Sequence, residues 1–577
     1  MSRITVLLFC TALASSVSAQ TPPPQPAPAP SHATTTASQQ VPDGGMPAYI
    51  KAETPEQRKQ RLGIDEDPGI NPDPSAHFWR YGKSYHIEKF DRRWASYQDV
   101  DPGEVRPFAY INATNEVYQQ NDKWVWVWVR DVSPEELAAP TSTPRYSNEQ
   151  LQYFQDMRSE FSELTPKDSG KIVHFVKDTD GLPNDGSWRN SLAVADMNGD
   201  GCPDIIAPPE RKGQGKPSIY LGDCKGHWKY WAEANFPVRI DYGNVVAADF
   251  NKDGHMDLAF GVHQIGIFLF LGDGKGNFKL VTNGLPRDYA TRRVAVADMN
   301  GDGYPDIIAL SEGVQGFSNK PAGKIRVYFN HNKGTVWQAE DLAAPNRPVA
   351  GDWLTVAHLT GESTPDVVSS SIYMNSNDVV FLGDGSKAWK PLGADAHLLP
   401  PLGYYYANAA GKFASKRRDD AILSYVRFWP SDLDKSIVPE PSADTVVGLD
   451  RLSFVSGKPV RTPVARWASN RPILGMAVGD FDGDGNLDII YTRHDPREAV
   501  ILLGDGKGGF TRATVEGLTL EPLTNYDITV ADVNQDGKPD VIVMYESNAT
   551  TTFARQNGSI QVFLNRGTTS LPVEAKK

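Results

Sequence analysis

One nine-residue pattern recurs along this chain and constrains its fold more than any other feature. The pattern, Asp-x-Asp/Asn-x-Asp-Gly-x-x-Asp, places oxygen-bearing side chains at positions 1, 3, 5 and 9. Each clear copy follows a short alternating apolar run and precedes β-forming residues such as Ile205-Ile206. These flanks predict that each copy is a loop joining two β-strands. The clear copies begin at Asp196, Asp249, Asp298, Asp480 and Asp532.

The copies divide the C-terminal part of the chain into repeated units. After each loop comes a second strand-like run that ends in a turn, as in FLFLGDGKG from Phe268. Two weaker copies, beginning at His358 and Lys412, keep the loop length and the final aspartates, Asp366 and Asp420. Seven units, recurring every roughly 50 to 60 residues and holding about four short strands each, predict an all-β fold. A seven-bladed β-propeller fits this repeat.

The two ends of the repeated region predict how the ring closes. Interior units have a further strand after the glycine turn, such as 278–281, but the last turn at Arg566-Gly567 is followed only by a polar tail. A strand-like run over 171–176 precedes the first loop. This N-terminal strand is expected to complete the last unit, which leaves no long open sheet edge.

The acidic side chains of the loops predict bound calcium. Carboxylates crowded into nine residues repel one another unless a cation neutralises them. All the candidate ligands are hard oxygens, which favour Ca²⁺ over Zn²⁺ or copper. An EF-hand is disfavoured because position 12 is Ala207 in the first unit and strand-forming residues follow the loop. The alternative, a series of Asp-Gly turns without metal, is disfavoured by five copies in register.

The loops and the GDGKGNF-type turns resemble FG-GAP or VCBS repeats, including those of the integrin α-subunit propeller. The resemblance covers about residues 170–567. It implies a seven-bladed β-propeller with Ca²⁺ in about five loops between blade strands. The ligands that it implies are Asp196, Asn198, Asp200 and Asp204; Asp249, Asn251, Asp253 and Asp257; Asp298, Asn300, Asp302 and Asp306; Asp480, Asp482, Asp484 and Asp488; and Asp532, Asn534, Asp536 and Asp540.

Units four and five depart from the pattern. At positions 1, 3, 5 and 6, unit four carries His358, Thr360, Glu362 and Ser363, and unit five carries Lys412, Ala414, Lys416 and Arg417. Neither unit is expected to bind Ca²⁺. In unit five, either a lysine ammonium replaces the ion and pairs with Asp420 or Asp419, or the loop is an ordinary solvated basic loop.

The two cysteines outside the first nineteen residues are Cys202 and Cys224. Cys202 stands at the start of one expected strand and Cys224 at the end of the next. Because those ends are neighbours in an antiparallel pair, a disulfide is predicted. Free thiols are the alternative.

The residues before the repeats predict export and a separate N-terminal region. Arg3, an apolar stretch and Val17-Ser18-Ala19 indicate a signal peptide over 1–19, and hence an extracellular or periplasmic protein. Residues 20–45 are rich in Pro and Thr and are expected to form a disordered linker. The N-terminal region, 46–166, holds one amphipathic helix, expected over 148–164 after a capping box. The propeller spans 167–567 and a tail spans 568–577.

A tryptophan-rich segment in the N-terminal region permits two interpretations. Residues 123–130 alternate strictly, so a strand would place Trp124, Trp126 and Trp128 on one face. The tryptophans either form a stacking platform for sugar rings or pack as core. Replacing Trp126 with alanine would separate lost glycan binding from lost stability.

Charge and motifs narrow the functional classes. A net charge of −13 argues against nucleic-acid binding, and no stretch after the signal is long enough to span a membrane. Without a recognisable catalytic motif, a non-catalytic scaffold for protein or glycan partners is favoured. The alternative is a polysaccharide lyase or hydrolase, with a cluster on the connection at 425–470 formed by Tyr425, Arg427, Trp429 and Asp432. A structural component of an envelope assembly is a third interpretation.

Overall fold

The computed structural model describes residues 148–571 with internal gaps and, before them, the backbone of three short strands. Strands β1 (Ala109–Ile111), β2 (Glu116–Gln120) and β3 (Trp126–Asp131) form one antiparallel sheet. The gaps are 212–214, 264, 286–288, 313–323, 343–348, 372–378, 386–387, 393–402, 431–432, 434, 523 and 547–557. The predicted signal peptide, the linker and Trp124 lie outside the described residues. Strand β3 begins at Trp126 rather than at 123, and its side chains are not described.

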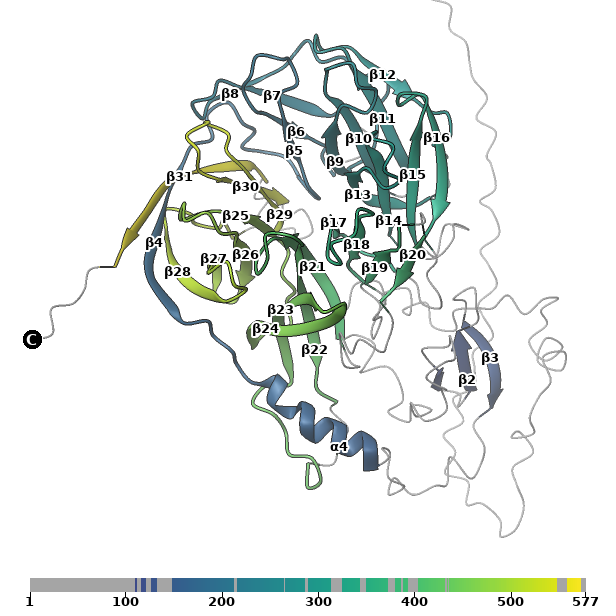
Figure 1. Cartoon of the computed structure of the whole chain (residues 1–577), viewed down its shortest axis with the longest axis vertical. Coiled ribbons are helices and arrows are strands. Elements are labelled where there is room, and N and C mark those ends of the chain that lie inside the picture. Colours follow the sequence, from purple (N-terminus) through teal and green to yellow (C-terminus); the bar gives the residue numbers. More distant parts are fainter. Residues whose placement is uncertain are drawn as a thin grey trace, which may run out of the picture. The chain divides into compact units, whose positions relative to one another are not determined.

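Four-stranded antiparallel sheets of sequential strands dominate the remaining structure (Figure 1). The first contains β5 (Ala193–Ala195), β6 (Asp204–Ala207), β7 (Ser218–Gly222) and β8 (Trp228–Tyr230). The second contains β9 (Gly243–Ala248), β10 (Asp257–Val262), β11 (Gly266–Gly272) and β12 (Phe278–Val281). The third contains β13 (Thr291–Ala297), β14 (Asp306–Ser311), β15 (Ile325–His331) and β16 (Val336–Asp341).

Two further sheets follow the same plan. The fourth contains β17 (Leu354–Ala357), β18 (Asp366–Ser369), β19 (Val380–Gly383) and β20 (Trp389–Pro391). The fifth contains β21 (Gly403–Gly411), β22 (Asp420–Phe428), β23 (Thr445–Val455) and β24 (Lys458–Ala468). Its long strands fill most of the connection that the sequence left open between units five and six.

The remaining eight strands form one sheet that unites both ends of the repeated region. Its strands are β25 (Met476–Gly479), β26 (Asp488–His494), β27 (Arg497–Gly504), β28 (Phe510–Glu516), β4 (Asp168–Lys177), β31 (Ile560–Ser570), β30 (Asp540–Glu546) and β29 (Thr524–Ala531), in that spatial order. As predicted, the N-terminal strand β4 pairs antiparallel with the last strand, β31 (Figure 1). The sequence did not predict that β4 also pairs, in parallel, with β28.

Strand β31 is longer than the sequence suggested. The glycine turn expected at Arg566-Gly567 is a register shift within the strand, where Gly567 takes a φ of +92°. Pairing then resumes, and Thr568 to Ser570 lie opposite Val173 to Lys171. The first three residues of the predicted tail therefore belong to the sheet, because β4 offers them a partner strand.

The apolar core lies between successive sheets. Buried side chains of the first sheet, such as Ile219, pack with Phe270 of the second, and comparable clusters join each sheet to the next along the chain. The strands next to the C-terminus pack on the first sheet through Val562 and Ile205. The molecule is thus all-β, built from repeated four-stranded sheets, and consistent with a β-propeller.

The predicted N-terminal helix packs on the fifth sheet. The α-helix α4 spans Asn148–Met157 and continues as a 3-10 turn, η4 (Arg158–Phe161), so it ends before the expected Leu164. Its buried residues Met157 and Phe161 pack against Trp429 and the connection that follows β22. Within the described residues, no helix is both long and apolar enough to cross a membrane.

Candidate metal centres

The predicted loops occupy the same place in every unit. Each joins the first strand of its sheet to the second, and the aspartate at position 9 is always the first residue of that second strand. In order, these aspartates are Asp204, Asp257, Asp306, Asp366, Asp420, Asp488 and Asp540. The motif therefore forms a β-loop-β unit and not an EF-hand.

Backbone N–H groups fix the carboxylates of the five acidic loops. In the first loop, Gly201 donates to Asp196 Oδ2 at 2.8 Å, and Cys202 donates to Asp200 Oδ1 at 2.8 Å. The N–H groups at positions 6 and 7 donate in the same way in the loops that begin at Asp249, Asp298, Asp480 and Asp532. Position 6 has a φ between +83° and +91°, which only glycine adopts readily. The five loops are thus held in one shape.

The aspartate at position 9 is more deeply buried than the other candidate ligands. Asp257 has no exposed surface, and its two oxygens accept hydrogen bonds from Phe250 N and Gly272 N at 2.9 and 2.8 Å. These bonds tie the loop to the far end of β11. Burial raises the pKa of Asp257 to about 7, and that of Asp204 to about 6. The raised pKa means that ionising the buried carboxyl group costs free energy, and a nearby cation would offset that cost.

Sequence reasoning assigned position 9 to metal binding alone and missed this structural role. Asp366 in unit four, a loop that lacks the aspartate at position 1 and the Asp/Asn at position 3, accepts the same pair of bonds from Leu359 N and Gly383 N. The sequence did contain an indication of this structural role, because position 9 is the one acidic position that units four and five both retain.

Unit six gathers the most carboxylates, because its position 3 is Asp482 where the other four acidic loops carry asparagine. Oxygens of Asp480, Asp482 and Asp488 lie within 4.8 Å of one another, close enough to hold one metal ion. In the first three loops the asparagine amide donates to the position 5 carboxylate, which an aspartate cannot do.

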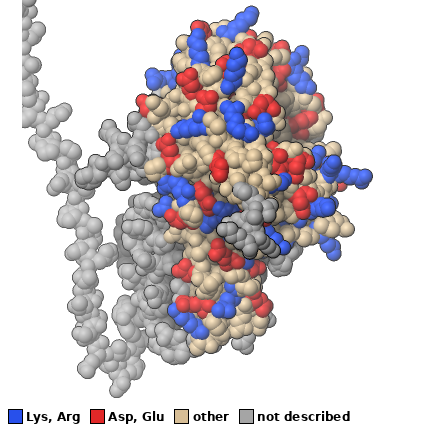
Figure 2. Space-filling model, turned by 90° about the vertical axis from the view of Figure 1, so that its left-hand side faces the viewer, with Lys and Arg blue, Asp and Glu red and all other residues tan. Residues whose placement is uncertain are grey.

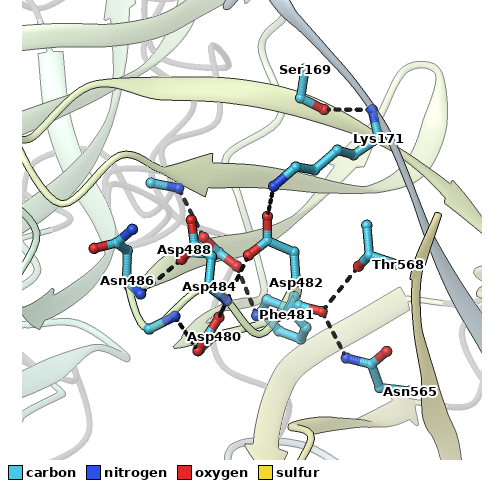
Figure 3. Close-up of polar contacts among 12 residues, drawn as sticks. Ser169, Lys171, Asp480, Phe481, Asp482, Asp484, Asn486, Asp488, Asn565 and Thr568 are labelled. Atoms are coloured by element: carbon cyan, nitrogen blue, oxygen red, sulfur yellow. Dashed lines mark hydrogen bonds and ion pairs between the residues drawn. The ribbon is translucent and has the colours of Figure 1, made fainter. Parts of the chain in front are cut away.

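A lysine from the N-terminal strand supplies a positive charge to unit six instead. Figure 3 shows Lys171, on β4, reaching across to Asp482, with Nζ 2.5 Å from Oδ2. This hydrogen bond raises the pKa of Lys171. Nothing in the sequence pattern pointed to Lys171, because β4 is brought beside the loop only by the pairing of distant strands.

The loops of units four and five differ in shape from the acidic loops, and one hypothesis about unit five is corrected. Neither Ser363 nor Arg417, at position 6, has a positive φ, so these loops lack the bend of the acidic ones. In unit five, the cation that pairs with Asp420 is Arg451 of β23, with Nη1 3.2 Å from Oδ2, and not a lysine of the loop. The long strands of the fifth sheet carry Arg451 to that position.

The predicted disulfide is confirmed. Cys202 and Cys224 are joined, with their Cα atoms 5.1 Å apart. The bridge links the first acidic loop to the turn after β7, at the place where the hydrogen bonds of position 9 link the same two segments. Such a bond is compatible with an oxidising compartment.

The residues proposed for a catalytic cluster do not form a surface site. Tyr425 and Arg427 are fully or almost fully buried on β22, and Trp429 packs under the N-terminal helix. Arg427 forms an ion pair with Glu160 of η4. Asp432 lies outside the described residues. The prediction failed because this connection consists largely of strands rather than an exposed loop.

On one face of the molecule, positive and negative side chains are mixed. On the face shown in Figure 2, Lys, Arg, Asp and Glu side chains are interspersed among uncharged residues.

Fold and loops together define a repeat protein in which four-stranded sheets carry acidic strand-connecting loops. The sequence profile of FG-GAP-like repeats matches residues 211–260, 263–309 and 467–543. The chain thus contains FG-GAP-like repeats, and the predicted FG-GAP repeat family is confirmed. No curated protein matches the chain.

Three of the solved structures that match the chain have low sequence identity and low TM-scores. A crystal structure of BBS1N in complex with ARL6DN, soaked with mercury, has 9% identity and a TM-score of 0.39, covering 66% of this chain and 94% of that one. The same complex soaked with lead has 10% identity and a TM-score of 0.33, covering 68% and 97%. The Photorhabdus luminescens Tc holotoxin pore has 15% identity and a TM-score of 0.34, covering 70% of this chain and 15% of the toxin chain.

Proposed function

We propose that the protein is a secreted, calcium-binding, seven-bladed β-propeller that acts as a non-catalytic scaffold for protein or glycan partners. The blades would be the five four-stranded sheets and the two halves of the eight-stranded sheet, divided between β28 and β4. The packing of the β29–β31 strands on the first sheet supports a closed ring.

One contact supports the ring more directly than any other. Arg293 on β13 and Asp527 on β29 belong to sheets that are not neighbours along the chain, yet Nη1 and Oδ2 are 2.9 Å apart. Such an ion pair requires the first strands of distant blades to converge on a common centre. In this proposal the propeller spans 167–567 together with the end of β31, after the signal peptide, linker and N-terminal region predicted above.

The calcium sites would lie in the five acidic loops, with the ligands predicted from the sequence. The hydrogen-bonded shape shared by these loops, and the three-carboxylate group of unit six, support this assignment. The ion would neutralise clustered carboxylates and fasten each loop between two strands.

The scaffold proposal is tested by offering the calcium-loaded protein a panel of polysaccharides and following both retention and chain length. Binding without shortening of the polymer is expected. Release of new reducing ends or unsaturated sugar ends would contradict a non-catalytic role.

Replacing Lys171 with methionine should increase the response of the protein to calcium. Without calcium, the variant should melt at a lower temperature because Asp482 loses its positive partner. With calcium, the ion in unit six no longer competes with the ammonium group of Lys171. The affinity of the unit six loop for calcium should therefore rise about threefold to tenfold. Melting with and without calcium measures both effects. Lys177→Met, also on β4 and ion-paired with Glu521, is the control and should leave the calcium response unchanged.

A further inference from the structure

A cleft lies between the basic loop of unit five and the acidic loop of unit six. Its volume is about 600 Å³, and one wall is formed by Gly411, Lys412, Ser415, Lys416 and Asp419. The facing wall contains Asn486, Leu487 and the nearby turn at Gly506. A volume of this size is typical of sites that bind a small molecule or a few units of a polymer.

The basic wall carries two lysines that have no structural task among the described residues. Lys412 and Lys416 occupy positions 1 and 5, where the five acidic loops carry aspartate. Both side chains are exposed. The position 9 carboxylate of their loop, Asp420, is paired with Arg451, whose side chain is largely buried. Their positive charges are therefore available to a ligand.

The acidic residue that lines the cleft is already engaged elsewhere. Asp419 Oδ2 accepts a hydrogen bond from His358 N at 2.8 Å, and the backbone N–H of Asp419 donates to His358 O at 3.0 Å. These two bonds tie Asp419 to the loop of unit four. On this wall, the two positive charges of Lys412 and Lys416 exceed the single negative charge of Asp419 among the lining residues.

Besides the two lysines and Asp419, the lining consists of short side chains, Leu487 and three glycines. Ser415 and Asn486 offer hydrogen-bonding groups, and Leu487 is the one apolar side chain among the lining residues, none of which is aromatic. Peptide partners usually need buried aromatic or aliphatic anchors, which this cleft does not offer. Basic runs with polar neighbours suit acidic polysaccharides better.

We propose that this cleft binds the sulfate or carboxylate groups of an acidic polysaccharide, through Lys412 and Lys416. The inference rests on the proposed function, since it names the class of partner that the scaffold would take. Binding should be stronger with calcium present. The wall opposite the lysines belongs to a loop with four aspartates, and an ion there would reduce their repulsion of an anionic ligand.

The test uses the full mature chain, saturated with calcium, and three probes: a heparin oligosaccharide, an oligogalacturonate and a poly-glutamate peptide. The variant Lys412→Glu/Lys416→Glu is compared with Lys229→Glu/Lys279→Glu, which makes the same change in charge on exposed lysines of other sheets. The cleft variant should lose about tenfold or more in affinity for at least one oligosaccharide, and the control less than about twofold.

Three results would overturn the proposal: equal losses in both variants, no loss in the cleft variant, or binding of poly-glutamate without binding of either sugar. Calcium content and melting temperature are measured on the same samples. If these are normal while oligosaccharide binding is absent or unaffected by the cleft substitutions, the cleft assignment fails and the calcium-binding scaffold stands. If calcium is absent as well, the proposed function fails with it.

Discussion

Replacing Asp257 with alanine should destabilise the protein by about 3 kcal/mol or more even without calcium. The substitution leaves the buried N–H groups of Phe250 and Gly272 without an acceptor, and each hydrogen bond to a charged group contributes about 1.5 to 3 kcal/mol. With calcium, the loss should grow by about 2.7 kcal/mol if the ion is present at a hundred times its dissociation constant. Denaturant titrations with calcium and with chelator measure both effects.

The matched control is Asp366→Ala. Asp366 accepts the same two backbone hydrogen bonds in a loop that is not expected to bind calcium. The stability that Asp366→Ala loses should be similar with and without calcium. An identical calcium response in the two variants would show that Asp257 is only a structural residue. Should Asp257→Ala fail to fold, Asp257→Asn retains one acceptor and allows the same comparison.

Replacing Asp527 with alanine should cost about 3 to 5 kcal/mol, because it leaves the guanidinium of Arg293 without its carboxylate in a largely buried position. The side chains are 3% and 11% exposed, and Arg293 also lies over the ring of Trp353 at 4.8 Å, which limits its escape to solvent. Burial raises the pKa of Asp527, and Arg293 opposes that shift. The free energy of unfolding from denaturant titration is the measurement.

A double-mutant cycle separates the ion pair from other effects of the substitution. The variant Arg293→Met/Asp527→Ala removes both charges and should regain part of the stability that Asp527→Ala loses. Strict additivity, with each single substitution costing less than about 1 kcal/mol, would mean that the two strands do not meet.

Local sequence was sufficient to predict the loops, the strands beside them and the pairing of the N-terminal strand. The loops and strands depend on short-range patterns, such as the glycine at position 6 and the alternation before Asp196, and the pairing followed from the strand that the last repeat lacks. The disulfide followed from the same register, since Cys202 and Cys224 occupy adjacent strand ends.

Apart from the structural role of the position 9 aspartates, the features that the sequence did not predict depend on contacts between segments that are distant in the sequence. Lys171 pairs with Asp482, which lies 311 positions away in the sequence, and Arg427 pairs with Glu160, which lies 267 positions away. Arg451 replaces the expected lysine because β23 runs beside Asp420. No repeating pattern in the sequence indicates which residues come into contact across such separations. The substitution of aspartate for asparagine at position 482 was the one local sign that an extra cation was needed.

The central claim, that the acidic loops bind calcium and thereby stabilise the ring, is tested most directly by measuring the calcium content of the purified mature protein together with its melting temperature. We expect about five calcium ions per chain, in line with the five acidic loops, and a marked fall in melting temperature when a chelator removes them. A protein that carries no calcium, and melts at the same temperature with and without the chelator, would contradict the claim.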